Sequence, residues 1–241
     1  MVRLIGILFI FMLLIGCKTT NKAISPKVFI EGKITFEKYT DVTEEGKKQA
    51  DKIFEDIISK ASIDSNQTHS KAEILAFKSM VLADMFNENK SEVLINVQKD
   101  TIWRFQKQGE MYIDYIRVEK NNGFLHFYDY PNTSIESRPY FDLFKENIDC
   151  SVEIVKKQRK RLLGYDCYKV ILIPKVEKID ETIPFGDTVF EMYVTEQVEL
   201  PLHALINIGK PFSFFPLEVI SYSSNLKGLK EIHKVLKIEA R

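Results

Sequence analysis

The sequence has no excess of charge of either sign and few of the residues that build metal centres. Its 34 Lys and Arg side chains are matched by 34 Asp and Glu side chains, so the formal net charge is zero. Nucleic-acid-binding domains carry a basic excess, so we expect no nucleic-acid partner. The four histidines and three cysteines are scattered, and no His-x-x-x-His or Cys-x-x-Cys pair occurs. We therefore predict no metal site.

The signatures of common catalytic sites are also missing. The sequence contains no Gly-x-Ser-x-Gly motif, no phosphate-binding loop and no Gly-x-Gly-x-x-Gly fingerprint. We expect no catalytic residue and no cofactor, and we predict that the chain is not an enzyme. An enzyme whose acidic residues converge only in the folded chain remains an alternative.

One apolar run stands at the start of the chain, and it is too short to cross a membrane. Arg3 precedes an uncharged stretch from Leu4 to Gly16, whereas a transmembrane helix needs roughly 20 apolar residues. Its length and its basic flank are typical of a secretory signal peptide. We predict that residues 1–16 are a signal peptide.

The run ends in Leu14-Ile15-Gly16-Cys17, which resembles the lipobox of bacterial lipoproteins. The resemblance implies cleavage before Cys17 and acylation of its thiol; a plain signal peptide ending in Cys is the alternative. Each buried methylene group contributes about 0.8 kcal/mol, so two or three acyl chains hold a protein on a membrane. Residues 17–26 are then the lipidated cysteine and a polar tether. Because the tether has no acidic cluster, we expect the periplasmic face of the outer membrane in the cell envelope.

Residues 27–241 are long enough for a single domain with a sizeable core. Thr43 opens a helical pattern whose apolar residues, among them Ala50 and Phe54, share one stripe. A second helix is predicted over residues 71–87, after the Ser70 and Glu73 capping box. Its apolar residues spread around much of the helix circumference, so a strand is the alternative.

From Glu92 the apolar period changes to two, which indicates β-strands. A four-strand antiparallel meander is predicted at residues 93–97, 101–105, 111–118 and 124–130. Further strands are predicted at residues 28–37, 152–155, 165–173, 189–194, 217–222 and 232–238, and residues 131–147 are predicted to form a loop. No βαβ alternation appears, so the predicted class is α+β, with a large antiparallel sheet that the two helices cover on one face.

Three segments carry a family resemblance: Glu92–Asp100 leading into Ile102-Trp103-Arg104, Arg161–Val170 with its Gly-Tyr-Asp-Cys-Tyr-Lys run, and Met192–Pro201. They resemble periplasmic lipoproteins of Bacteroidetes type, including the GLPGLI family and related families with a LolA-like half-barrel. Where the name-giving motif falls, this sequence has Phe214–Ile220 and keeps only a Pro-Leu-x-x-Ile outline. The resemblance implies a curved antiparallel sheet wrapped over helices, with a concave face that holds lipid or another apolar ligand. It brings no catalytic residue.

On this basis we predict a non-enzymatic module that binds an apolar ligand such as lipid in a cavity of the sheet. The predicted lining residues are Trp103, Phe105, Tyr115, Phe212, Phe214 and Phe215. The Pro211–Pro216 loop either plugs the core or forms a flap over the cavity. The alternative function is an accessory protein with a filled core, which contacts a protein partner in an envelope assembly.

Cys150 and Cys167 flank the basic run Lys156–Arg161. A hairpin centred near Gln158–Arg159 would bring them within the Cα separation of roughly 4.4–6.8 Å that a disulfide requires. We predict that they are bonded, and two reduced thiols are the alternative. The basic run is either a solvated hairpin or a contact with anionic headgroups.

Overall fold

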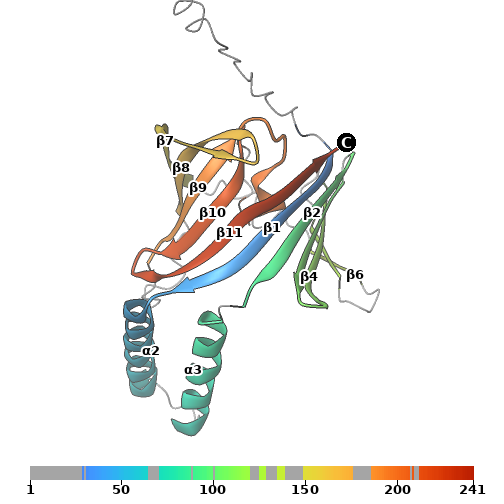
Figure 1. The fold of residues 1–241 in the computed structure, drawn as a ribbon. Coiled ribbons are helices and arrows are strands. Elements are labelled where there is room, and N and C mark those ends of the chain that lie inside the picture. Colours follow the sequence, from blue (N-terminus) through green and yellow to red (C-terminus); the bar gives the residue numbers. More distant parts are fainter. Residues whose placement is uncertain are drawn as a thin grey trace, which may run out of the picture.

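The computed structural model describes residues 29, 31–64, 71–87, 89–99, 101–119, 125–128, 135–138, 149–175, 186–206, 208 and 212–241. Over these ranges the chain forms one open antiparallel β-sheet with two α-helices at one end (Figure 1). The predicted signal peptide, Cys17 and the tether lie outside the described residues. Within the described ranges, no helix is long and apolar enough to span a membrane.

The sheet consists of two antiparallel meanders that meet along its middle. Its strands are β1 (Gly32–Val42), β2 (Ser91–Gln98), β3 (Thr101–Gln108), β4 (Met111–Glu119), β5 (Leu125–Tyr128), β6 (Ile135–Arg138), β7 (Asp149–Leu162), β8 (Tyr165–Lys175), β9 (Thr188–Thr195), β10 (Phe215–Ser223) and β11 (Leu226–Ala240). They are ordered β6-β5-β4-β3-β2-β1-β11-β10-β9-β8-β7. The first and last strands therefore pair with each other, which joins the two meanders. The predicted meander is confirmed as β2 to β5, whereas β6 lies in the stretch predicted to be a loop.

Residue alternation defines an inner and an outer face of the sheet. Ile34 and Phe36 of β1 are fully buried, whereas Lys33 and Asp41 are exposed. Successive strand residues point to opposite faces, and we call the face of Ile34 and Phe36 the inner face. Figure 1 shows a strongly curved sheet, and inner-face residues of both meanders belong to one hydrophobic core cluster.

The inner face is covered by the connection between β9 and β10. Residues 198–206, here called the inner segment, contain the 3-10 helix η1 (Leu202–Ala204). Phe29 anchors this segment, because its N–H donates to Gln197 O at 2.7 Å and its carbonyl accepts from Glu199 N at 3.0 Å. Leu202, Ala204 and Leu205 are buried in the same core cluster as the inner-face residues. The inner segment therefore fills the half of the sheet that contains the Gly32 end of β1.

The helices α2 (Glu44–Asp64) and α3 (Lys71–Met85) confirm the two predicted helices. Thr43 caps α2, since its Oγ1 accepts a hydrogen bond from Gly46 N at 3.0 Å. The Thr43 N–H donates to Gly228 O of β11 at 2.9 Å, which attaches the start of the helix to the sheet. Lys78 of α3 pairs with Asp51 of α2 at 3.0 Å, which links the two helices.

The helices do not cover a face of the sheet in the way that the sequence analysis predicted. Figure 1 shows α2 and α3 extending beyond the ends of β1 and β2. The reason is local, because only Thr43 separates the end of β1 from the start of α2 and no loop lets the helix fold back. The helices therefore border only the Val42 end of the inner face, and the inner segment covers the Gly32 end.

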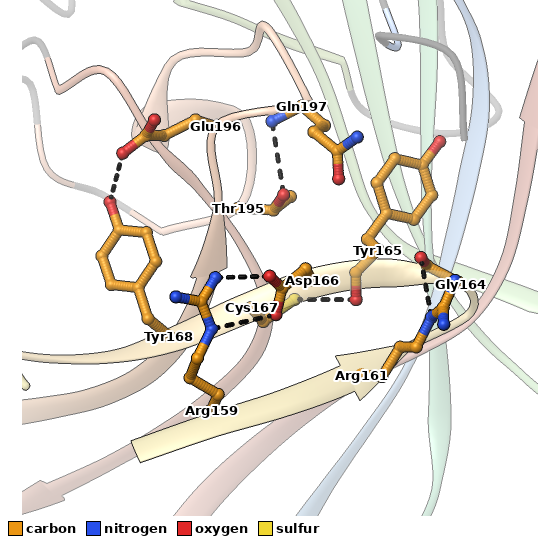
Figure 2. Close-up of polar contacts among 10 residues, drawn as sticks. All are labelled: Arg159, Arg161, Gly164, Tyr165, Asp166, Cys167, Tyr168, Thr195, Glu196 and Gln197. Atoms are coloured by element: carbon orange, nitrogen blue, oxygen red, sulfur yellow. Dashed lines mark hydrogen bonds and ion pairs between the residues drawn. The ribbon is translucent and has the colours of Figure 1, made fainter. Parts of the chain in front are cut away.

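The predicted disulfide between Cys150 and Cys167 is wrong. The β7–β8 hairpin turns at Leu163 and Gly164, whose φ values of 48° and 91° suit a two-residue turn, and not at Gln158–Arg159. In this register Cys150 lies opposite Pro174 and Cys167 lies opposite Lys160. Seven residues of β8 separate those two positions, a span of roughly 23 Å at 3.3 Å per residue. The Cys167 thiol instead lies 3.8 Å from the Tyr165 carbonyl (Figure 2), and burial raises its pKa to about 12.

Candidate functional site: two adjoining chambers

A cavity of about 350 Å³ opens on the inner face beside the inner segment, and we call it the polar chamber. It is lined by Lys38, Val93, Arg104, Gln106, Thr188, Phe190, Leu205, Ile206, Ser221, Glu231 and His233. Most of these side chains are polar or charged, although they stand on the face that elsewhere forms the hydrophobic core.

The polar chamber arises because the inner-face positions change character along each strand. On β1 the inner residues run Ile34, Phe36, Lys38, and the register with β11 places Lys38 opposite His233. The inner positions of β3 change from Ile102 to Arg104 in the same way. On β1 and β3 these residues follow strand alternation, so the apolar part of the face continues directly into the polar part.

The charged residues of the polar chamber differ in burial, because Arg104 is buried whereas Lys38 and Glu231 are partly exposed. Lys38 Nζ lies 2.8 Å from a carboxylate oxygen of Glu231. Arg104, which is 8% exposed, donates from Nη1 to the Leu205 carbonyl of the inner segment at 3.3 Å. Among the described residues, the lining contains the cations Lys38 and Arg104 and the carboxylate Glu231.

His233 is kept neutral by its position. Burial lowers its pKa to about 4; the charge of Glu231 raises this pKa, while Lys38 and Arg104 lower it further. The Nδ1 atom of His233 is buried, and among the described residues it has no hydrogen-bond partner. Glu231 Oε1 lies 3.8 Å from this Nδ1 atom, which is beyond hydrogen-bond length.

A second cavity, of about 560 Å³, lies between the helices and the Val42 end of the sheet, and we call it the apolar chamber. It is lined by Thr40, Phe54, Val81, Met85, Thr188, Ser221, Tyr222, Ser223, Leu226, Leu229 and Glu231. Thr188, Ser221 and Glu231 line both chambers, so the two spaces adjoin. Together they form a site with an apolar end and a polar end.

Trp103 and Phe105, two of the predicted lining residues, do not line either chamber. Trp103 and Phe105 alternate with Ile102 and Arg104, so they point to the outer face of β3. There the two rings stack with centroids 6.4 Å apart, and the Arg117 guanidinium lies 5.6 Å from the Trp103 centroid. Tyr115 pairs with Phe105 through the backbone, and its side chain lies outside the described part of the structure.

The predicted lining residues of the aromatic loop belong to the core. Phe215 is fully buried and contacts Phe36 edge-on, with ring centroids 6.5 Å apart. Phe214 is buried and stacks on Phe212 at a centroid distance of 5.0 Å. Of the two interpretations of this loop, the core plug fits the described residues and the flap does not.

The basic run lies on β7, the edge strand of the sheet, rather than in a turn. Figure 2 shows Arg159 paired with Asp166 of β8, and Lys160 lies 2.6 Å from a Glu218 oxygen of β10. Charged side chains on an edge strand also oppose pairing with another sheet. This placement fits a largely solvated run with internal partners, and a headgroup contact stays a prediction.

The sequence analysis missed Arg104 and His233, the two buried polar residues of the site. A signal for Arg104 was present, because its position in Ile102-Trp103-Arg104-Phe105 puts a cation on the face of Ile102. His233 follows the same alternation on β11, two residues before the buried Val235. No local signal showed that the inner segment would stop beside these residues and leave a cavity.

The fold and the site define an α+β protein with an open antiparallel sheet and two adjoining chambers on its inner side. No protein-family model and no curated protein matches the chain. The crystal structure of the lipoprotein LppX of Mycobacterium tuberculosis is similar over 88% of this chain and 90% of that one, with 6% sequence identity and a TM-score of 0.34. At that score the likeness carries no argument, and the inferences below rest on the chambers themselves. The resemblance to the GLPGLI family stays a prediction.

Proposed function

We propose that this chain is a non-enzymatic lipoprotein of the cell envelope, anchored through Cys17, that binds an apolar ligand with an acyl chain in a LolA-like half-barrel. The observation that carries the proposal is the apolar chamber and its continuity with the polar chamber. Their volumes of about 350 and 560 Å³ fall in the range of roughly 300–1,000 Å³ that is typical of small-molecule sites. The space suits a single-chain ligand.

The apolar side chains of the apolar chamber come from both helices and from β11. Phe54 comes from α2, Val81 and Met85 come from α3, and Leu226 and Leu229 come from β11. The sparse packing is between α2 and α3, so α3 has room to adjust around a chain. An acyl chain placed there would remove apolar surface from water at about 25 cal/mol per Å².

The test is mass spectrometry of the full chain, expressed with its own leader in a host that processes lipoproteins. Denaturing spectra report acyl chains on Cys17, and native spectra from a non-ionic detergent report bound lipid. We expect a stoichiometric lipid, or stoichiometric uptake of added fatty acid after delipidation. A clean apo mass without uptake would contradict ligand binding, and an unmodified Cys17 would contradict the anchor.

A matched pair of variants locates the ligand. Met85→Trp fills the apolar chamber and should abolish uptake, because the larger ring occupies the space of the chain. Leu75→Trp changes the same helix at a residue that is 49% exposed and should leave uptake unchanged. Equal uptake by both variants would place the ligand elsewhere.

The second candidate function is an accessory role in an envelope assembly. Two observations favour it: the inner segment already fills half of the inner face, and α3 exposes apolar side chains, with Leu75 at 49% and Met80 at 64%. Exposed apolar residues on one helix are a common feature of protein contacts. The clean apo mass described above is the result that would favour this role.

A further inference from the structure

The turn of the β7–β8 hairpin carries an exposed apolar side chain at a backbone position that disfavours it. Leu163, the first residue of the turn, is 51% exposed and has a φ of 48°. At such a position Asn, Asp or Gly is favoured, because a left-handed φ strains a residue with a larger side chain. Neither burial nor backbone preference accounts for a leucine here, so its apolar surface is open to a partner.

Two lysines without an acidic partner lie on β7 near this turn. The register with β8 shifts between Val155 and Arg159, and the three residues between them form a bulge without opposite residues on β8. Two of the three are Lys156 and Lys157; both are exposed, and among the described residues neither pairs with a carboxylate. Val155 lies opposite Lys169, four residues from the start of β8, so the bulge is within roughly 13 Å of the turn.

The β7–β8 turn lies at the end of the sheet where the tether joins the domain. From β1 through β11, β10, β9 and β8 to β7, each strand is antiparallel to the next, so the turn lies at the Gly32 end. Figure 1 shows α2 and α3 beyond the opposite end of the sheet. The Phe29 N–H donates to the Gln197 carbonyl at 2.7 Å, and Gln197 follows β9, the neighbour of β8. The chain therefore enters the fold beside the β7–β8 hairpin.

The proposed acylation of Cys17 would keep this end of the sheet close to a bilayer. Residues 18–28 separate Cys17 from Phe29, and they reach at most roughly 40 Å when fully extended. A surface contact within that reach forms at a high effective concentration, so a small contact area is sufficient. Cations act on headgroups within a Debye length of about 10 Å, which is similar to the separation of the lysine bulge from the turn.

We infer that the Leu163 turn and the Lys156–Lys157 bulge form a second membrane contact, in which the lysines bind anionic headgroups and the leucine enters the edge of the acyl region. This inference rests on the proposed function, because it places the contact on the bilayer that carries the acyl chains of Cys17. The helices α2 and α3, which line the apolar chamber, then lie on the side of the domain away from that bilayer.

The experiment uses the full lipidated chain in phosphatidylcholine vesicles, with and without phosphatidylglycerol. Leu163→Cys and, as the matched control, Leu75→Cys carry the same polarity-sensitive maleimide probe, while Cys150 and Cys167 are buried and stay unlabelled. Leu75 is 49% exposed on α3, at the opposite end of the domain. The Leu163→Cys probe should show blue-shifted emission and quenching by spin-labelled lipid, more strongly with phosphatidylglycerol. The Leu75→Cys probe should show neither change.

A pair of double variants tests the charges of the bulge. With Lys156→Gln and Lys157→Gln together, the ratio of docked to undocked chain reported by the Leu163→Cys probe should fall about fivefold for each lysine removed. The matched control, Lys48→Gln with Lys52→Gln, removes the same charge from exposed sites of α2 and should leave this ratio unchanged.

The outcomes separate this inference from the proposed function, because denaturing mass spectra of the same samples report the acyl chains on Cys17. Acylated Cys17 with equal spectra for the two probes would overturn the membrane contact and leave the proposed function standing. A Leu163→Cys response that persists without phosphatidylglycerol and without both lysines would overturn the role of the bulge. An unmodified Cys17 would overturn the anchor and this inference together.

Discussion

The two halves of the inner face follow the same strand alternation but are covered in different ways. In the half around the Gly32 end of β1, here called the filled half, the inner residues are apolar and the inner segment packs on them. In the half toward the Val42 end, here called the hollow half, the inner residues are Lys38, Arg104, His233 and their neighbours, and a cavity remains. The first half provides stability, whereas the second half retains groups that a packed core would exclude. The difference separates the part of the sheet that holds the fold together from the part available to a ligand.

The largest expected effect comes from removing an aromatic ring in the filled half. Phe215→Ala should lower the free energy of unfolding by about 3–5 kcal/mol, because Phe215 is fully buried and the inner segment cannot collapse into the space. Urea unfolding of the purified chain measures this loss.

The matched control is Phe190→Ala in the hollow half. Its ring already faces the polar chamber on one side, so we expect a loss of only about 1–2 kcal/mol. Equal losses of unfolding free energy for the two variants would show that the two halves of the inner face are packed alike.

A smaller effect is expected from acid, and it arises in the hollow half. Burial lowers the pKa of His233 to about 4, against 6.5 for the unshifted group, so the unfolded chain binds this proton first as the pH falls. The stabilising contribution is therefore fully present above pH 6.5 and is lost as the pH falls toward 4. Between pH 7.5 and pH 5 the loss is about 2 kcal/mol.

Urea unfolding at both pH values checks this effect. The His233→Gln variant should lose less stability between pH 7.5 and pH 5 than the unmodified chain. Part of the acid effect should remain, because burial also lowers the pKa of His203 to about 4. The same pH dependence in the variant and in the unmodified chain would mean that His233 is exposed to water in solution.

The smallest effect tests how the helices border the hollow half. A Cβ atom on Gly46 of α2 would lie 2.3 Å from the carbonyl oxygen of Gly228, so Gly46→Ala must push α2 away from β11. We expect a loss of about 1–2 kcal/mol, although Ala in place of Gly normally stabilises a helix by roughly 1 kcal/mol. Lys48→Ala, at an exposed site of the same helix, is the control and should change little. Stabilisation by Gly46→Ala would mean that α2 is not held against the sheet.

Much of the fold follows from local patterns. The period-two alternation predicted β2 to β5, and Thr43 with the following acidic residues predicted the start of α2. The β7–β8 hairpin was predicted with the wrong turn because the basic run was taken as the turn, although Gly164 offered the positive φ that a tight turn needs. That one misplaced turn produced the wrong disulfide between Cys150 and Cys167.

The site was less predictable than the fold. Aromatic residues of the central strand were assigned to the cavity, but Trp103 and Phe105 share the outer face of β3, and the chamber is built on the face of Arg104. Which face of a strand is the inner one depends on what covers it, and the covering segment lies about a hundred residues further along the chain.

The sequence by itself determined which residues share a strand face, where the helices begin and where the apolar stretches lie, because these depend on neighbours a few positions apart. Only the tertiary structure decided that residues 198–206 cover one half of the inner face and stop beside Arg104 and His233. The physical reason is that alternation assigns a side chain to a face, whereas filling or leaving open the space above that face depends on the packing of distant segments.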